Sequence, residues 1–123
     1  MSLQQFDKKN YLNLETTRKN GQAVKTPVWF AQDGDTLLVW TEVDSGKAKR
    51  IRRDGKVRVV PSTASGAPLG EWVNGTAIAD SSPDAIKYVT SKFKQKYGMM
   101  FKAFNMLGRT RGGKHTTIRI RLE

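Results

Sequence analysis

The amino-acid sequence predicts a mainly β protein with α insertions, built as a small barrel of six antiparallel strands. Two observations carry this prediction. In the first two thirds of the chain, side chains alternate between two sets with the two-residue period of a strand. A clear helix start, Ser82-Pro83-Asp84, precedes the last strand. Closure into a barrel would remove exposed sheet edges. With 123 residues, 37% of them hydrophobic, residues 1–123 are expected to form a single domain that buries its own core.

Three strands are expected in the first part of the chain, at residues 12–16, 24–31 and 36–43, because each alternates two sets of side chains. Lys19-Asn20-Gly21 should form the first turn. Asp33-Gly34 should close the second hairpin, since such a pair tolerates the positive φ angles of tight turns. We therefore expect these three strands to form an antiparallel meander.

The rest of the chain is expected to contain three more strands and three helical segments. Ser82 caps a helix whose apolar stripe of Ile86, Val89, Phe93 and Tyr97 a barrel could cover, and Gly98 ends it. The expected elements are a short helix at 47–53, strands at 57–62 and 71–79 with a bulge at Asn74-Gly75, the helix at 82–97, a helical piece at 99–107 and a strand at 116–122.

A strand end, a helix cap and a group of cations meet between residues 40 and 50. Ser45 is a good N-cap residue, and the first turn of a helix offers free N–H groups and a positive dipole end. The hydroxyl of Thr41 and the ammonium of Lys47 could point at the same anion. Seven of the 22 cations lie between positions 47 and 58, opposed only by Asp54: Lys47, Lys49, Arg50, Arg52, Arg53, Lys56 and Arg58. This run predicts a phosphate site.

Composition narrows the classes of function. The net charge of +11 indicates anionic partners. There is no cysteine, and a single histidine, His115, with scattered acids gives no metal-ligand spacing, so we expect no metal site and interpret His115 as a structural or surface residue. No apolar run approaches the ~20 residues that cross a bilayer, and no signal peptide is recognised, so a soluble, cytoplasmic protein without a membrane partner is expected.

An ordered set of motifs, spread from Leu12 to Leu122, resembles the flavin- and deazaflavin-binding split-barrel family. That family contains the pyridoxamine 5'-phosphate oxidases and the F420-dependent reductases, and the resemblance is closest to the short F420-linked branch. The motifs, in chain order, are Thr26-Pro27-Val28-Trp29-Phe30, Leu38-Val39-Trp40-Thr41, Ser45-Gly46-Lys47, Lys49-Arg50-Ile51, Val57-Arg58-Val59 and Gly70-Glu71-Trp72-Val73. The resemblance implies an FMN-binding split barrel.

The resemblance also implies roles for individual residues. Thr41, Ser45, Gly46 and Lys47 correspond to phosphate-binding positions, with Lys49 and Arg50 as further charge partners. A second set is implied to lie along the flavin or deazaflavin ring: Thr26, Pro27, Val28, Trp29, Val60, Pro61 and Trp72, the last from the same or the partner subunit. Pro27 cannot donate to a sheet ladder, so its strand is open to a planar ligand there.

The implied activity is hydride transfer between F420 or FMN and an unknown small organic substrate. The cofactor would carry the chemistry, so no catalytic side chain is required. FMN has one terminal phosphate, whereas F420 has a phosphodiester and an oligoglutamate tail, and the surplus of cations favours F420. The resemblance further implies a homodimer with the cofactor at the subunit interface.

Two non-enzymatic alternatives stay open. The family branch also contains carriers of other planar ligands. Independently, the net charge, three tryptophans among cations on strands and the Arg-Gly-Gly element at residues 109–114 are compatible with a small barrel that binds nucleic acid. Because strand tryptophans more often belong to a core or a dimer contact, nucleic acid is the less favoured partner.

Overall fold

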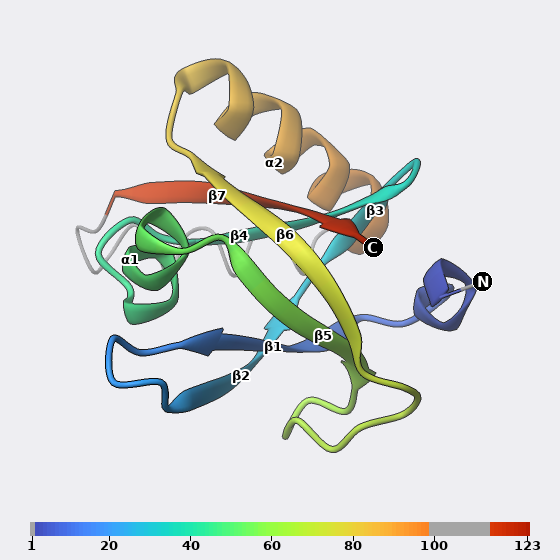
Figure 1. The fold of residues 1–123 in the computed structure, drawn as a ribbon. Helices are drawn as coiled ribbons and strands as arrows, with labels where there is room; N and C mark the ends of the chain where they lie inside the picture. The colour runs from blue at the N-terminus through green and yellow to red at the C-terminus, as the bar shows by residue number, and fades with distance from the viewer. Residues whose placement is uncertain (1, 99–113) are drawn as a thin grey trace.

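Seven antiparallel strands form one strongly curled sheet in the computed structural model, which describes residues 2–98 and 114–123 (Figure 1). The mainly β class is confirmed, but with seven strands where the sequence predicted six. The elements are η1 (Ser2–Phe6), β1 (Tyr11–Thr17), β2 (Ala23–Trp29), β3 (Ala31–Asp33), β4 (Thr36–Glu42), α1 (Gly46–Arg53), β5 (Lys56–Ser62), β6 (Val73–Asp80), α2 (Pro83–Tyr97) and β7 (His115–Leu122).

The extra strand arises because the predicted strand at 24–31 divides at Phe30. The sheet order is β2-β1-β5-β6-β7-β4-β3, so β2 and β3 lie at opposite edges of the sheet although one residue separates them in the chain. The Phe30 carbonyl accepts hydrogen bonds from Lys96 Nζ (2.8 Å) and from the Tyr97 hydroxyl instead of continuing a ladder. The expected meander is therefore wrong: β2 pairs with β1, and β4 pairs with β3 and β7.

Both predicted hairpins are present. The first turns at residues 18–22, where the Gly21 N–H donates to the Arg18 carbonyl (2.9 Å) and Gly21 has φ +88°. In the second, Asp33 pairs with Thr36, so the turn residues are Gly34 and Asp35, one position later than the predicted pair. Gly34, with φ +59°, supplies the left-handed conformation that this turn needs.

The predicted bulge in the fifth expected strand is wrong. Gly75 pairs in unbroken register with Val57 of β5 and Leu122 of β7. A Cβ placed on Gly75 would lie 3.0 Å from the Arg121 carbonyl oxygen. Glycine here allows close approach of two backbones, which is its other common use in a strand.

The core has two parts, on either side of β4. Inside the barrel, side chains of the strands pack with Phe6 and with Ile51 of α1; the main members are Leu12, Leu14, Leu37, Val39, Val59, Ile118 and Ile120. On the outer face, α2 covers Leu38 and Trp40 with its own Val89 and Phe93. Thus the predicted stripe of α2 does cover the barrel, and α1 closes one end of it through Ala48 and Ile51 (Figure 1).

Both helix caps follow the sequence prediction. The Ser45 and Ser82 hydroxyls accept hydrogen bonds from the Ala48 and Ala85 N–H groups, each at 3.2 Å, and Gly98 ends α2. The predicted helical piece at 99–107, and residues 109–113 of the predicted basic loop, lie outside the described residues. Within residues 2–98 and 114–123, no helix combines the length and apolar character needed to span a bilayer.

Candidate cofactor site

The first turn of α1 brings the predicted phosphate-binding residues together. Thr41, near the end of β4, donates through Oγ1 to Ser45 Oγ (3.5 Å), and Ser45 caps the helix. The next N–H groups, those of Gly46 and Lys47, have no carbonyl partner within the helix, as in any first helical turn. Two hydroxyls and two N–H groups therefore lie around one helix end, where the dipole favours an anion.

Arg50 folds back over this helix end. A Cβ placed on Gly46 would lie 2.8 Å from Arg50 Nη1, so the missing side chain of Gly46 is what admits the guanidinium. Arg50 Nε donates to Thr16 Oγ1 at 2.6 Å, which fixes the guanidinium from the end of β1. Burial, and then the neighbouring Arg18 and Arg53, lower the pKa of Arg50 from its ordinary value.

Lys47 is a half-buried cation at the same helix end. Burial chiefly, and then the charge of Arg50, lower the pKa of the Lys47 ammonium, while Glu42 acts in the opposite direction. These causes mean that the positive charge at this point is incompletely balanced by the protein. An anion placed between Lys47 and Arg50 would stabilise both charged forms.

A basic cavity of about 480 Å³ adjoins the helix end. No acid is among its lining residues, and five of the six are cations: Arg18, Lys19, Gly46, Lys49, Arg50 and Arg53. Lys49, predicted as a further charge partner, lies on this side of α1. The cavity therefore extends from the predicted phosphate site toward the turn between β1 and β2.

The predicted ring-binding residues are divided between the two faces of the sheet. Pro27 lies in register with Asn13 and Val60, and these three side chains share the outer face. Val28 lies in register with Leu12 and Pro61 and faces the barrel core. By the same alternation, Thr26 faces inward and Trp29 outward, so only part of the predicted set can contact one side of a planar ligand.

The backbone edges of β2 and β4 diverge beside the phosphate site. The β3–β4 pairing runs only to Ala31 and Leu38, and β2 then turns away to pair with β1. Had the hairpin continued in register, Val28 would face Thr41. Beyond Ala31, therefore, β2 and β4 are not paired with each other, and Pro27 and Thr41 lie on these separate strands.

Trp72 lies one row of residues away from Pro27. On the outer face, Lys25, Glu15 and Arg58 pair across β2, β1 and β5. Lys25 Nζ and Arg58 Cζ lie 5.1 and 5.0 Å from the Trp72 ring centroid, and Arg58 also approaches Glu15 at 3.5 Å. Two cations thus lie near the Trp72 ring, and contact between Trp72 and a cofactor ring stays a prediction.

Three residues that sequence reasoning missed border the site. Thr16 holds Arg50, as described above. Asn13 is 7% exposed, donates to the Gly66 carbonyl (2.9 Å) and has no hydrogen-bond partner for its Oδ1 among the described residues. Trp40 stacks on His115, with ring centroids 4.1 Å apart. Pairing between distant strands creates these contacts, so no local pattern could reveal them.

His115 stands beside the site rather than in a remote loop. It pairs with Glu42, the residue after Thr41. Burial lowers the pKa of the imidazole, and Glu42 acts against that shift. Among residues 2–98 and 114–123, no group of three side chains could hold a metal ion.

The fold is shared with solved structures of low sequence identity. A heme storage protein from Vibrio cholerae superposes with a TM-score of 0.73 and 11% identity, over 98% of this chain and 87% of that one. A conserved hypothetical protein from Mycobacterium tuberculosis gives 0.71 and 20%, over 98% and 77%. An F420 reductase gives 0.63 and 16%, over 98% and 91%. At such identities the likeness establishes the fold alone.

The family is established by the sequence as a whole. No curated protein matches this sequence. A family model described as pyridoxamine 5'-phosphate oxidase, however, matches residues 2–123, nearly the entire chain. Together with the split barrel, this match confirms the resemblance drawn from the motifs, and the chain belongs to the pyridoxamine 5'-phosphate oxidase family.

Proposed function

We propose that this protein binds F420 or FMN and acts as an oxidoreductase that transfers hydride to a small organic substrate. The observation that carries the proposal is the end of α1, where Arg50 folds over Gly46 beside the half-buried Lys47. This arrangement gathers two cations, two hydroxyls and the free N–H groups of one helical turn. It suits a phosphate group, which both cofactors contain.

The unpaired edge of β2 supports the position of the ring. Pro27 has no N–H, and it lies at the edge of the sheet, where β2 pairs only with β1. A planar ring along residues 26–29 would meet backbone on one side, with the outward Pro27 and Trp29 next to it. When bound, the cofactor supplies the hydride chemistry, and these residues orient it and exclude water.

The basic cavity beside Gly46 favours F420 over FMN. FMN would use only the helix end, because it has one terminal phosphate. The cavity offers Arg18, Lys19 and Arg53 beyond that end, with no acid in its lining. A cofactor with an anionic tail would use these additional cations, and so we propose F420 as the preferred ligand.

We also propose that the protein acts as a homodimer with the cofactor at the subunit interface. The ring would lie on the outer face of β2, which leaves its other side for a second subunit. A monomer in light scattering at micromolar concentration, with cofactor bound, would contradict this part of the proposal.

The substitution Lys47→Glu tests the phosphate site. Reversing this charge should reduce affinity for F420 and FMN at least a hundredfold, measured by fluorescence quenching at moderate salt, while the circular dichroism spectrum stays unchanged. Lys87→Glu makes the same change on the exposed side of α2 and should bind as the wild type does. Unchanged affinity in Lys47→Glu would refute the site. Failure of the wild type to bind either cofactor, with salt-dependent oligonucleotide binding instead, would refute the proposed function.

A planar-ligand carrier is the second candidate function, favoured by the stacked Trp40 and His115 beside the strand end that carries Thr41. The heme storage protein from Vibrio cholerae has the same fold. Hemin titration followed by absorbance would test it: a saturable shift in wild type, lost in His115→Ala, supports the carrier. Turnover of reduced F420 with any acceptor would favour the enzyme.

A further inference from the structure

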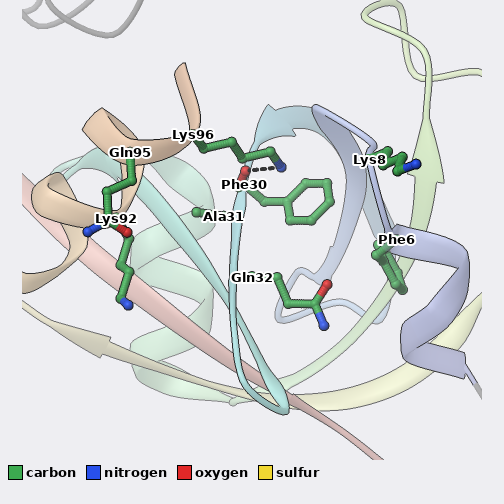
Figure 2. A pocket seen from close by; sticks show the side chains of 8 residues that line it. All are labelled: Phe6, Lys8, Phe30, Ala31, Gln32, Lys92, Gln95 and Lys96. Atoms are coloured by element: carbon green, nitrogen blue, oxygen red, sulfur yellow. Dashed lines mark hydrogen bonds between the residues drawn. The ribbon is translucent and has the colours of Figure 1, made fainter. Parts of the chain in front are cut away.

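A second cavity, of about 310 Å³, lies away from the cofactor site, between the N-terminal segment, the bend at Phe30 and the last turns of α2 (Figure 2). No carboxylate is among its lining residues. They are Phe6, Lys8, Phe30, Ala31, Gln32, Lys92, Gln95 and Lys96. The cavity therefore joins three segments that are far apart in the chain.

The ammonium of Lys96 is the central charge of this cavity. Lys96 as a residue is exposed, but its Nζ end donates to the carbonyls of Lys9 (2.6 Å) and Phe30 (2.8 Å) and lies 3.9 Å from the Phe30 ring centroid (Figure 2). These partners are all neutral. Burial lowers the pKa of the Lys96 ammonium to about 8, which is the expected effect when a cation loses water without gaining a counter-charge.

The other charged groups around the cavity leave this imbalance in place. Lys92 Nζ lies 3.7 Å from Asp33 Oδ1, outside the lining, and so Asp33 is already engaged. In Figure 2 the ammonium groups of Lys8 and Lys92 point away from that of Lys96. The hydroxyl of Tyr97 donates to the Asn10 carbonyl and is no counter-ion. The Lys96 ammonium therefore has no acidic partner among the residues that line the cavity.

The floor of the cavity is closed by two aromatic rings that expose almost no surface. Phe6 and Phe30 pack edge to face, with ring centroids 5.7 Å apart, and are 1% and 0% exposed. Gln32 enters from the bend, and its Nε2 already donates to the Gly34 carbonyl (3.2 Å), which leaves a second hydrogen to give. The volume is at the lower end of the range of small-molecule sites.

We propose that this cavity is a binding site for a small carboxylate, whose anionic group contacts Lys96 and Gln32. A carboxylate supplies the missing counter-charge, and a molecule of the size of benzoate suits the volume. A dianion such as phosphate is disfavoured, because only one uncompensated ammonium faces the cavity. This site is independent of the proposed cofactor site.

Benzoate is the probe, with benzamide as its uncharged counterpart, and titrations are followed by NMR of the lysine side chains and backbone amides. Wild type should bind benzoate saturably, with shifts at Lys96, Gln32 and Phe30, and bind benzamide at least tenfold more weakly. Saturating benzoate should also raise the pKa of the Lys96 ammonium, because a bound anion favours its charged form.

Two variants make the test independent of folding. Lys96→Met should weaken benzoate binding at least tenfold, but it also removes the two carbonyl contacts. Gln32→Glu alters an exposed residue and adds a negative charge to the cavity, so it should weaken benzoate to the same degree in a folded protein. Lys94→Met, on the same helix but outside the lining, should change nothing. Equal affinity for benzoate and benzamide, or unchanged benzoate affinity in Gln32→Glu, would overturn the proposal.

The two proposals fail separately. Lys47→Glu should leave benzoate binding unchanged, whatever it does to F420 or FMN. If Lys47→Glu abolishes benzoate shifts at Lys96, the probe is binding at the α1 site and the cavity proposal is wrong.

Discussion

The substitution Gly46→Ala should separate the stability of this protein from its affinity for phosphate. The added Cβ would lie 2.8 Å from Arg50 Nη1, closer than these two atoms can remain, and 3.3 and 3.4 Å from Arg50 Nη2 and Cζ. The guanidinium ends a flexible side chain, so it should move rather than the helix. Its displacement would remove one of the two cations that the proposed phosphate site depends on.

The magnitudes follow from the contacts. A hydrogen bond to a charged group contributes about 1.5–3 kcal/mol, so loss of the Arg50–phosphate contact should weaken F420 or FMN binding roughly 10- to 150-fold. Alanine in place of glycine gains about 0.4–1 kcal/mol of stability. Strain on the 2.6 Å bond from Arg50 to Thr16 offsets part of that gain, so the free energy of unfolding should change by less than about 1 kcal/mol.

The assay is a cycle of Gly46→Ala, Arg50→Ala and the double variant, with cofactor affinity from fluorescence quenching and stability from urea unfolding. If Gly46→Ala acts through Arg50, it should add nothing further to Arg50→Ala. Additive losses of affinity, or wild-type affinity in Gly46→Ala, would refute the reasoning.

Three further predictions concern stability. Ser82→Ala removes the hydroxyl that caps α2 and should cost about 1 kcal/mol in urea unfolding, and a value near zero would contradict the cap. Phe93→Ala should lower the free energy of unfolding by about 3–5 kcal/mol, because this 1% exposed side chain joins α2 to the outer face of β4. The control Ile78→Thr, at a 65% exposed position, should change it by less than about 0.5 kcal/mol. Equal costs would show that α2 is loosely packed. The pKa of Lys96 is lowered to about 8 from an ordinary 10.5, so between these pH values the unfolded chain binds more protons than the folded protein. The free energy of unfolding of wild type, relative to that of Lys96→Met, should therefore rise as pH increases through this range. A difference that does not depend on pH would show that the shift is absent.

The locally determined features were predictable from the sequence. Ser45 and Ser82 cap their helices because a cap involves a residue and the N–H three positions later. Gly21 and Gly34 stand in their turns because only neighbouring dihedral angles are involved. The motifs from residue 26 to residue 73 carried the family, which the match over residues 2–123 confirms.

The errors share one cause, which is long-range pairing. The meander failed because the Phe30 carbonyl bonds to Lys96 and Tyr97, more than sixty positions away. The predicted bulge is wrong because glycine at position 75 lets the backbone of β7 approach closely. The residues next to Gly75 in the sequence do not indicate this contact. The residues predicted to lie along the cofactor ring were expected to share one surface. Pairing with β1 fixes the register of β2, however, and successive residues of a strand such as Pro27 and Val28 then point to opposite faces of the sheet.

The sequence by itself determined the β class, both helix caps, the family and the basic character of α1, since all of these depend on local geometry or on residue type. The tertiary structure alone decided where the barrel splits, that Arg50 lies over Gly46, and that the Lys96 ammonium meets the Phe30 carbonyl beside a cavity whose lining contains no acid. Each of these requires groups that are distant in the chain to meet, and only the packing of α1 and α2 on the sheet brings them together.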